Sequence, residues 1–329
     1  MDSRPGCENR NGERGKPLVT FALLGYNQEE YVRAAVEAAL AQDYSPLEII
    51  LSDDCSEDRT YEIMQEAVRG YSGPHQVVLN RNAFNHKIGG HINVINRIAR
   101  GEMIVLAASD DISIPTRTSR IVDQWLGTGK RVGVVHSSCF TIDRSGNKLR
   151  KLPCPCLSAL NSLAKTASGN TYVIGATSAW VRQLHQTFGD LKSDIAHEDC
   201  ALAFRSLLAG LEIAYIDEPL VLYREFVGSS GFYKGDGGHL LPQQRLIFLE
   251  RARNDYQQRL QDLARMPNSA IQRIVRKRLH YFEAALRFES GAPGLRELVR
   301  LATLTGVPGT LRLAVKRLVN QRRDARCAH

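Results

Sequence analysis

The 329-residue sequence contains no long hydrophobic run. Its longest purely apolar stretches, such as Ile49 to Leu51 and Met103 to Ala108, are far shorter than the roughly 20 residues that cross a bilayer. The segment from Met1 to Lys16 is polar and lacks the apolar region of a secretory signal. These absences argue against a transmembrane or secreted protein, and they predict a flexible leader over 1–16 and a cytoplasmic location.

Paired cysteine motifs are missing as well. The seven cysteines are scattered, and no spacing resembles a CxxC zinc framework, which fits a reducing compartment. For Cys154 and Cys156, within Leu-Pro-Cys-Pro-Cys, three interpretations stay open: a metal site, a strained disulfide, or a loop made rigid by its prolines. The remaining composition, 43% hydrophobic and 24% charged, is that of a globular protein.

Acidic residues are scarce only near the end of the chain. Residues 241–329 carry 18 Lys and Arg against 7 Asp and Glu, whereas residues 1–240 carry 25 against 28. This asymmetry predicts an anionic partner for the last quarter, either phospholipid head groups or nucleic acid. No nucleic-acid-binding motif or row of interleaved aromatic residues accompanies the charge, so no specific nucleic acid is expected.

A basic amphipathic helix is predicted over 311–319. Its apolar residues share one helical face, and Arg312, Lys316 and Arg317 lie elsewhere on the turn. Such a helix can lie on the inner face of an anionic membrane, or it can pack its apolar stripe on the rest of the protein. Peripheral membrane contact through 241–329 is therefore one of two predictions for this region.

Apolar β-forming segments alternate with segments of helical periodicity in the first half of the chain. Four strand and helix pairs are predicted, at 18–24 and 29–41, 47–51 and 59–68, 76–79 and 92–99, and 103–107 and 117–126. Strands this apolar are buried on both faces of a parallel sheet with right-handed crossovers. Ligands of such sheets bind beyond the carboxyl ends of the strands.

The second half is less regular. We predict a strand over 131–142, an irregular loop over 150–172, a helix over 200–208 and short strands over 212–215 and 219–223. The glycine-rich segment 228–238 predicts a mobile loop or a hinge. After residue 241 the pattern is helical, with breaks at Pro267, 291–294 and 306–309.

Two acidic pairs follow predicted strands and meet the same sheet edge. One lies in Ser52-Asp53-Asp54-Cys55-Ser56 and the other in Ala108-Ser109-Asp110-Asp111. Either pair alone could be a turn or a helix N-cap. Together they predict a site with two functions. One pair of carboxylates suits a divalent cation, Mg²⁺ or Mn²⁺, that bridges a diphosphate, and the other pair can accept hydrogen bonds from a base or ribose.

The order of these motifs is similar to that of family 2 glycosyltransferases, which belong to the GT-A fold of the nucleotide-diphospho-sugar transferase superfamily. The matching segments are Val19 to Gly25, Tyr26-Asn27, Ser52 to Ser56, Asn82, Asn93, Gly101-Glu102 and Ser109-Asp110-Asp111. The resemblance covers about residues 17–226.

The resemblance implies an α/β fold with a GT-A Rossmann-like mixed sheet, mainly parallel and flanked by helices, and with a C-terminal α-helical extension. It divides the chain into a catalytic domain over 17–235 and a basic helical region over 236–329. Within the catalytic domain, 17–112 would bind the nucleotide-sugar and 113–235 the acceptor.

The resemblance also implies which residues bind the nucleotide-sugar donor. Asp53 would read the nucleotide with Asp54 beside it, Asp110 would approach the ribose or sugar, and Asp111 would hold the divalent metal (Mn²⁺ or Mg²⁺). The other implied donor-binding residues are Ala22, Leu24, Tyr26, Glu29, Asn82, Asn93, Ser109, Gly175 and Arg224. Two positions depart from the family pattern, because Ala108 stands where an acid is common and Ile92 where an Arg is common. Lys87 or His91 could replace that Arg, or both could be surface residues.

His197-Glu198-Asp199-Cys200 resembles the family's Glu-Asp motif, with Asp199 as general base beside Glu198. The alternative is that these acids only cap a helix. Arg224 would clamp the diphosphate, or form a salt bridge to Glu218 or Glu225. Trp125 and Trp180 would stack on a sugar or fill the core.

The function implied is inverting transfer of a sugar from a nucleotide-diphospho-sugar to a saccharide or lipid-linked acceptor, in surface polysaccharide or lipopolysaccharide synthesis. The alternative is a non-catalytic nucleotide-sugar-binding or scaffold protein with a degraded metal site. A nucleotidyltransferase is disfavoured, because Leu24 to Asn27 lacks a glycine-rich basic signature.

Overall fold

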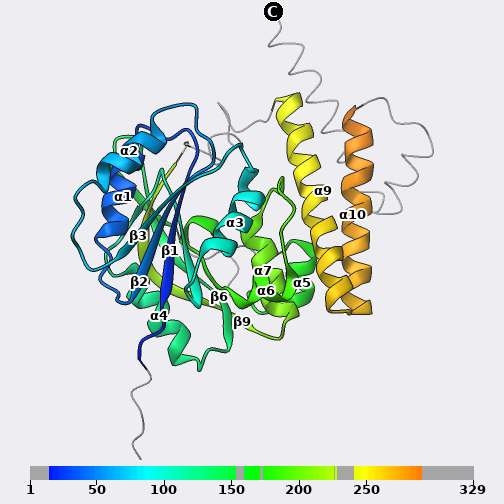
Figure 1. Ribbon diagram of the computed structural model, residues 1–329. Helices are drawn as coiled ribbons and strands as arrows, with labels where there is room; N and C mark the ends of the chain where they lie inside the picture. Colours follow the sequence, from blue (N-terminus) through cyan, green and yellow to red (C-terminus); the bar gives the residue numbers. More distant parts are fainter. Residues whose placement is uncertain (1–14, 153–158, 171–172, 226, 228–240, 291–329) are drawn as a thin grey trace, which may run out of the picture.

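The computed structural model describes residues 15–152, 159–170, 173–225, 227 and 241–290. Within these residues a nine-stranded mixed sheet is flanked by helices (Figure 1). Its strands lie in the order β3 (Gln76–Arg81), β2 (Leu47–Asp53), β1 (Val19–Gly25), β4 (Met103–Ala108), β8 (Ala179–Val181), β6 (Val132–Ile142), β9 (Glu212–Arg224) and β5 (Ile112–Ser113). β7 (Lys148–Leu152) pairs with β6 off this path. The sheet confirms the GT-A-like α/β fold expected from the sequence.

The first half of the sheet is parallel, as predicted. β1 pairs in parallel with both β2 and β4, and β2 with β3. Every residue of β1 and β2 is buried, because helices cover both faces. The crossovers contain α1 (Val32–Leu40), α2 (Thr60–Ala67) and α3 (Lys87–Ile98), and α4 (Arg117–Gly127) follows β5.

Gly101, just before β4, is needed where two strands approach closely. A Cβ on Gly101 would lie 2.4 Å from the backbone nitrogen of Thr20 in β1. The backbone N–H of Gly101 also donates a hydrogen bond to the Thr20 hydroxyl at 3.0 Å. This contact places the start of β4, and therefore the acidic motif at its end, against β1.

Two predictions for the second half are wrong. The segment 150–172 is not wholly irregular: β7 extends to Leu152, and α5 (Leu163–Ser168) is capped by Ser162 and ended by Gly169 at φ 79°. β9 is one strand of 13 residues instead of two short ones. Its pairing with β6 changes register before and after Pro219, which has no N–H for the ladder, but the chain stays extended through this point.

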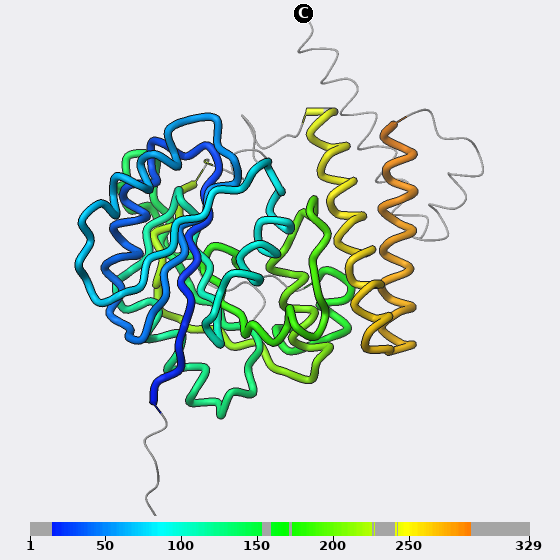
Figure 2. The backbone as a smooth tube through the Cα atoms, viewed as in Figure 1, coloured from blue at the N-terminus to red at the C-terminus, as the bar shows by residue number. Residues whose placement is uncertain are grey.

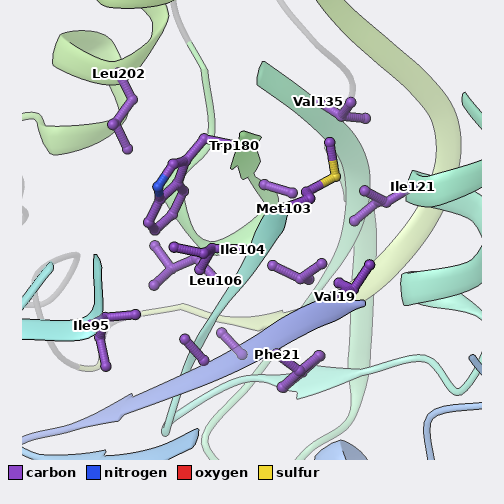
Figure 3. Close-up of a cluster of buried hydrophobic side chains, with 14 of the residues drawn as sticks. Val19, Phe21, Ile95, Met103, Ile104, Leu106, Ile121, Val135, Trp180 and Leu202 are labelled. Carbon is purple, nitrogen blue, oxygen red and sulfur yellow. The ribbon is translucent and has the colours of Figure 1, made fainter. Parts of the chain in front are cut away.

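The antiparallel strand β8 and the short helices η2 (Gly175–Thr177) and α6 (Gln183–Phe188) were not foreseen. β8 inserts between β4 and β6 and carries Trp180 into the main core. Figure 3 shows its indole beside Ile104 and Leu106 of β4. Trp180 and Trp125 are 0% and 3% exposed, so both tryptophans fill the core.

The C-terminal helices α9 (Pro242–Arg265) and α10 (Ser269–Ser290) confirm the predicted helical extension, with the break at Pro267. They form a pair beside α5, α6 and α7 (Glu198–Leu208), on the side of the molecule away from α1 and α2 (Figure 1). A second hydrophobic core joins Ala167 of α5 and Phe204 of α7 to Tyr256 of α9 and Val275 of α10. Among the described residues, no helix is long and apolar enough to span a membrane. The predicted helix over 311–319, the glycine-rich segment 228–238 and the Cys154–Cys156 pair lie outside the described residues.

Candidate active site

The carboxyl ends of β1, β2 and β4 lie side by side, and the acidic motifs follow them directly. Gly25 is in register with Asp53. The backbone N–H of Asp54 donates to the carbonyl of Gly25 at 2.9 Å, and that of Ser109 to the carbonyl of Leu24 at 3.0 Å. The two acidic segments are therefore held on either side of the end of β1, as the sequence predicted.

Asp53 is completely buried, and its own loop orients it. Its carboxylate accepts hydrogen bonds from the hydroxyl and from the backbone N–H of Ser56, the latter at 3.0 Å. The guanidinium of Arg81 lies 3.5 Å from the same carboxylate, over the ring of Tyr61. These contacts fix the carboxylate at the strand end, next to the exposed Tyr26 that follows β1.

Asp54 and Asn82 form a linked pair beside Asp53. The Asn82 amide donates to Oδ1 of Asp54 at 2.7 Å, and the backbone N–H of His86 donates to the same oxygen at 2.9 Å. The backbone N–H of Asn82 donates to the carbonyl of Asp53 at 2.8 Å. The structure thus brings together three of the residues that the sequence assigned to the donor.

Asp110 and Asp111 occupy the other end of this edge. Oδ1 of Asp111 accepts a hydrogen bond from the backbone N–H of Arg224 at 2.7 Å, whereas its buried Oδ2 has no partner among the described residues. Burial and the charge of Asp110 raise the pKa of Asp111 well above its ordinary value, and burial also raises the pKa of Asp110. A nearby cation would offset the repulsion between two such carboxylates.

This pair of carboxylates fits a divalent ion that is bound together with a substrate. Among the described residues, no group of three or more His, Cys, Asp or Glu is arranged to hold a metal. The unpartnered Oδ2 of Asp111, beside Asp110, nevertheless offers the hard oxygen that Mg²⁺ and Mn²⁺ prefer. Magnesium sites commonly use one or two carboxylates and complete the coordination with water and substrate phosphates.

Arg224 is buried and supports this segment from below. Its guanidinium donates to the backbone carbonyls of Asp110 at 2.9 Å and of Asp143 and Arg144 at 2.8 Å each. It also lies over the ring of Tyr31, 4.4 Å from the centroid. The Arg224 guanidinium is therefore engaged by the Asp110 backbone and by the turn after β6.

The alternative salt bridge from Arg224 to Glu218 or Glu225 is wrong. Glu218 pairs instead with Arg120, and Glu225 pairs with Arg150 at 3.1 Å.

Gly175 brings the Glu-Asp motif of α7 to the same region. A Cβ on Gly175 would lie 2.7 Å from Oε1 of Glu198 and 3.3 Å from Oδ2 of Asp199, so a larger residue would displace the acids. The next carbonyl, that of Ala176, accepts a hydrogen bond from Arg117 at 3.0 Å, and Arg117 also donates to a backbone carbonyl of β4 at 2.6 Å. The short helix η2 thus lies between the α7 acids and the end of β4.

Glu198 and Asp199 share one enclosed environment in the first turn of α7. Burial, and then the charge of Asp199, raise the pKa of Glu198 to about 8, so Glu198 holds a proton at neutral pH. Burial also raises the pKa of Asp199, but the charge of His197 and the backbone N–H of Cys200, 2.6 Å away, favour its ionised form. Of the two acids, Asp199 has the closer support for its ionised form, through the backbone N–H of Cys200.

Two expected donor residues have their polar groups engaged elsewhere. The side-chain amide of Asn93 exchanges two hydrogen bonds of 2.8 Å with the backbone of Leu191, which ties α3 to the segment before α7. The carboxylate of Glu29 accepts from the backbone N–H of Arg59 at the start of α2. Ala22 lies within β1 with strands on both sides, and Leu24 is also buried.

His91 does not replace the Arg that the family commonly has at the position of Ile92. It is 3% exposed, and its Nε2 is hydrogen-bonded to the hydroxyl of Ser52 at 2.7 Å. Burial lowers the pKa of His91 to about 4, against the opposing charges of Asp54 and Asp53, so the ring is neutral near pH 7. Ile92 is completely buried in the core, and Lys87 is exposed.

Sequence reasoning missed Arg117 and Asp255. Arg117 is completely buried beside Asp111, and burial lowers its pKa to about 9. Asp255, in α9, contacts His197 just before the Glu-Asp motif. Neither residue belongs to a recognisable motif, and only the packing of distant segments brings them to the site.

The mainly parallel sheet flanked by helices has the architecture of GT-A proteins. The sequence model "Glycosyl transferase family 2" matches residues 23–208. The chain belongs to glycosyl transferase family 2.

Named relatives match only parts of the chain. This chain is 32% identical over 136 residues to the succinoglycan biosynthesis protein ExoO of Rhizobium meliloti. The match covers 41% of this chain and 36% of ExoO. The chain is 31% identical over 102 residues to the UDP-Glc:alpha-D-GlcNAc-diphosphoundecaprenol beta-1,3-glucosyltransferase WfaP of Escherichia coli, which covers 31% of this chain and 39% of WfaP. The matches therefore span well under half of either relative.

Among solved structures, the mannosyltransferase PcManGT of Pyrobaculum calidifontis, in complex with GDP-Man and Mn²⁺, aligns with a TM-score of 0.55. The alignment covers 93% of this chain and 88% of PcManGT at 18% identity. This likeness confirms the GT-A fold.

Proposed function

We propose that the protein is an inverting glycosyltransferase that moves a sugar from a nucleotide-diphospho-sugar to a saccharide or lipid-linked acceptor. Surface polysaccharide or lipopolysaccharide synthesis is the proposed context. Membership of family 2 supports the reaction class. The name of ExoO supports a polysaccharide pathway, and the name of WfaP supports a lipid-linked acceptor.

One observation carries the proposal: two acidic groups far apart in the sequence lie on either side of η2. Asp111 lies at the donor edge with an unpartnered carboxylate oxygen. Across η2, Glu198 and Asp199 lie against Gly175, with Arg117 linking η2 to β4. A single displacement needs the leaving diphosphate and the catalytic base on opposite sides of the reacting carbon, and this arrangement provides two separate positions for them.

In the proposed reaction, Asp199 accepts the proton of an acceptor hydroxyl as its oxygen attacks the anomeric carbon of the donor. The bond from that carbon to the diphosphate breaks on the opposite face, and the nucleoside diphosphate leaves with the electron pair. One displacement inverts the anomeric configuration. Glu198 is protonated at neutral pH and therefore uncharged, so in this proposal Asp199 is the single base.

Asp53 and Asp54 are proposed to bind the base and ribose of the donor, because their loop contacts already orient them. Asp111, with Asp110 beside it, would hold a divalent metal. When bound, such an ion supplies Lewis-acid stabilisation of the leaving diphosphate.

A comparison of Asp199→Asn with Glu198→Gln tests the assignment of the base. Asn cannot accept the proton, so we expect a loss of about 10²- to 10⁴-fold in the transfer rate. Gln resembles the protonated Glu198, and therefore Glu198→Gln should keep most activity at pH 7. Calorimetry with the donor should show unchanged binding in both variants. Full activity of Asp199→Asn would refute the assignment.

Calorimetric titration with UDP, GDP, dTDP and CDP, with and without Mn²⁺ or Mg²⁺, tests the donor site without an acceptor. WfaP uses UDP-Glc and PcManGT was solved with GDP-Man, so the relatives leave the nucleotide open. We expect metal-dependent binding of one nucleotide, and Asp111→Ala should remove the dependence on metal. If a folded sample binds none of the four, the non-catalytic scaffold becomes the better interpretation.

We also propose peripheral contact with an anionic membrane on the cytoplasmic side. The outer face of α10 carries Arg273, Arg276, Lys277 and His280, all of them exposed. These positions repeat every three or four residues, so the side chains form one basic stripe. A stripe of cations suits the negative surface of phospholipids.

A further inference from the structure

The segment before the Glu-Asp motif is held by α9, which belongs to the C-terminal extension. Figure 2 shows this backbone between α3 and α9. On one side the Asn93 amide binds Leu191, and on the other Gln258 of α9 accepts from the backbone N–H of Lys192 at 2.7 Å. The position of the motif therefore depends on a helix outside the matched residues 23–208.

Asp255 of α9 makes the contacts nearest to the motif. Its Oδ1 accepts hydrogen bonds from the backbone N–H groups of Ala196 at 2.9 Å and of His197 at 3.3 Å. Its Oδ2 lies 2.9 Å from Nδ1 of His197. α7 has no side-chain cap of its own at His197, and Asp255 binds from another helix the backbone N–H groups of the two residues that precede α7.

Resting on the proposed function, we propose that Asp255 and His197 are positioning residues for the base. Asp255 fixes the start of α7 through two backbone hydrogen bonds, and it holds the His197 imidazolium beside Asp199 and Glu198. The Asp255 side chain is 4% exposed and the His197 side chain 40% exposed, so the carboxylate is enclosed while the imidazole is partly open to solvent.

The charge of His197 has a direct effect on the base. Burial acts to lower the pKa of His197, but the hydrogen bond and charge of Asp255, and the charge of Asp199, raise it overall. The resulting cation in turn favours the ionised form of Asp199. Asp255 is thus expected to keep Asp199 deprotonated at a lower pH than burial alone would allow.

The other groups around His197 do not replace this pair. From α9, the ring of Phe248 approaches the imidazole edge-on at 6.2 Å, and Arg251 is paired with Asp194 at 2.7 Å. The guanidinium of Arg259 lies over the rings of Tyr256 and Phe204.

The experiment measures both the charge of His197 and the pH dependence of transfer. In full-length protein with ¹⁵N-labelled histidine, the His197 signal is identified by its loss in His197→Gln. In Asp255→Asn, the amide oxygen can keep the backbone contacts, but the amide nitrogen faces Nδ1 and disfavours the protonated ring. The pKa of His197 should therefore fall from its wild-type value.

The rate should respond in the same variants. We expect kcat to fall by up to about 100-fold, with little change in KM for the donor. The acidic limb of the kcat profile should move to higher pH in both His197→Gln and Asp255→Asn, because Asp199 loses a neighbouring cation. A purely structural role would lower kcat without moving this limb.

Asp194→Asn is the matched control. It removes a contact between the same segment and the same helix, the pair with Arg251, without touching His197. Its acidic limb should remain at the wild-type pH. An unchanged His197 titration in Asp255→Asn, or an unmoved limb in both variants, would overturn the inference. A wild-type protein without transfer activity would instead contradict the proposed function, and the His197 titration would still decide whether Asp255 sets this charge.

Discussion

Single residues of this protein show how burial changes chemistry. Glu198 and His91 are an ordinary acid and an ordinary base in the sequence, yet at neutral pH burial keeps the first protonated and the second neutral. The same physical cause thus removes two charges from the neighbourhood of the donor edge. The neutral ring of His91 therefore adds no positive charge beside Asp54.

His136 in β6 provides a test of burial at this scale. It is fully buried, neither ring nitrogen has a partner among the described residues, and burial lowers its pKa to about 4. The unfolded chain, with an ordinary pKa of 6.5, binds a proton at a higher pH than the folded protein does. Protonation of His136 therefore has little effect on stability above pH 6.5, and it lowers stability progressively as the pH falls from 6.5 to 4.

His136→Phe should remove this acid sensitivity, because phenylalanine fits the contact with the ring of Tyr215 and does not titrate. Relative to wild type, the variant should gain about 2 kcal/mol on going from pH 7 to pH 5. Urea unfolding at the two pH values measures the difference. His280→Gln, at an exposed histidine of α10, should keep the wild-type pH dependence. Equal acid sensitivity of His136→Phe and wild type would contradict the account.

Between elements, a buried ion pair links the helix α7 to the C-terminal helix α9. Arg205 of α7 and Asp262 of α9 have side chains only 1% exposed and share two hydrogen bonds of 3.0 and 3.1 Å. Gln258 donates to the same carboxylate at 2.9 Å. This pair fixes α9 against α7, and therefore fixes the helix that carries Asp255.

Asp262→Ala should destabilise the protein by about 3 to 5 kcal/mol, because it leaves the Arg205 cation buried without its counter-charge. The double variant Arg205→Met/Asp262→Leu should recover much of this loss, since it removes both charges and keeps apolar volume. Glu218→Ala breaks an exposed pair with Arg120 and should change stability little. Denaturant unfolding compares the three. A loss in Asp262→Ala no larger than in Glu218→Ala would show that the pair does not stabilise this interface.

At the scale of the whole molecule, charge is segregated along the chain. The first 240 residues are nearly neutral, and the excess of cations lies after residue 241. In the structure, part of that excess forms the basic stripe on α10. The sequence of 291–329 adds eight Lys and Arg against two acids, so its net charge has the same sign as the stripe.

Vesicle co-sedimentation tests the proposed membrane contact. We expect binding to vesicles of phosphatidylcholine with phosphatidylglycerol, and none to phosphatidylcholine alone. The triple variant Arg273→Glu, Arg276→Glu, Lys277→Glu should weaken binding by at least about 100-fold, at about 1 kcal/mol for each cation removed. The control Arg69→Glu, Arg131→Glu, Lys148→Glu changes the net charge equally at exposed sites elsewhere. If both triple variants bind alike, the α10 stripe is not the contact.

The sequence alone determined the parallel half of the fold and the position of both acidic pairs at the ends of its strands. Apolar strands end in acids at 53–54 and 110–111, and both the buried strands and the strand-end position follow from local pattern. The Glu-Asp motif was also recognisable. The wrong predictions concern β9, which was expected as two short strands, and α5, which was expected as an irregular loop. In both places the periodic pattern extends over few residues, and tertiary contacts determine the secondary structure.

Only the tertiary structure decided which groups surround the acids. Gly175 lies against Glu198 and Asp199, Arg117 joins η2 to β4, and Asp255 reaches His197 from 58 residues away. Strand and helix patterns depend on neighbouring residues, and a sequence displays those directly. Protonation states and long-range hydrogen bonds depend on which segments exclude water around a side chain, and that is settled only when α9 packs on α7.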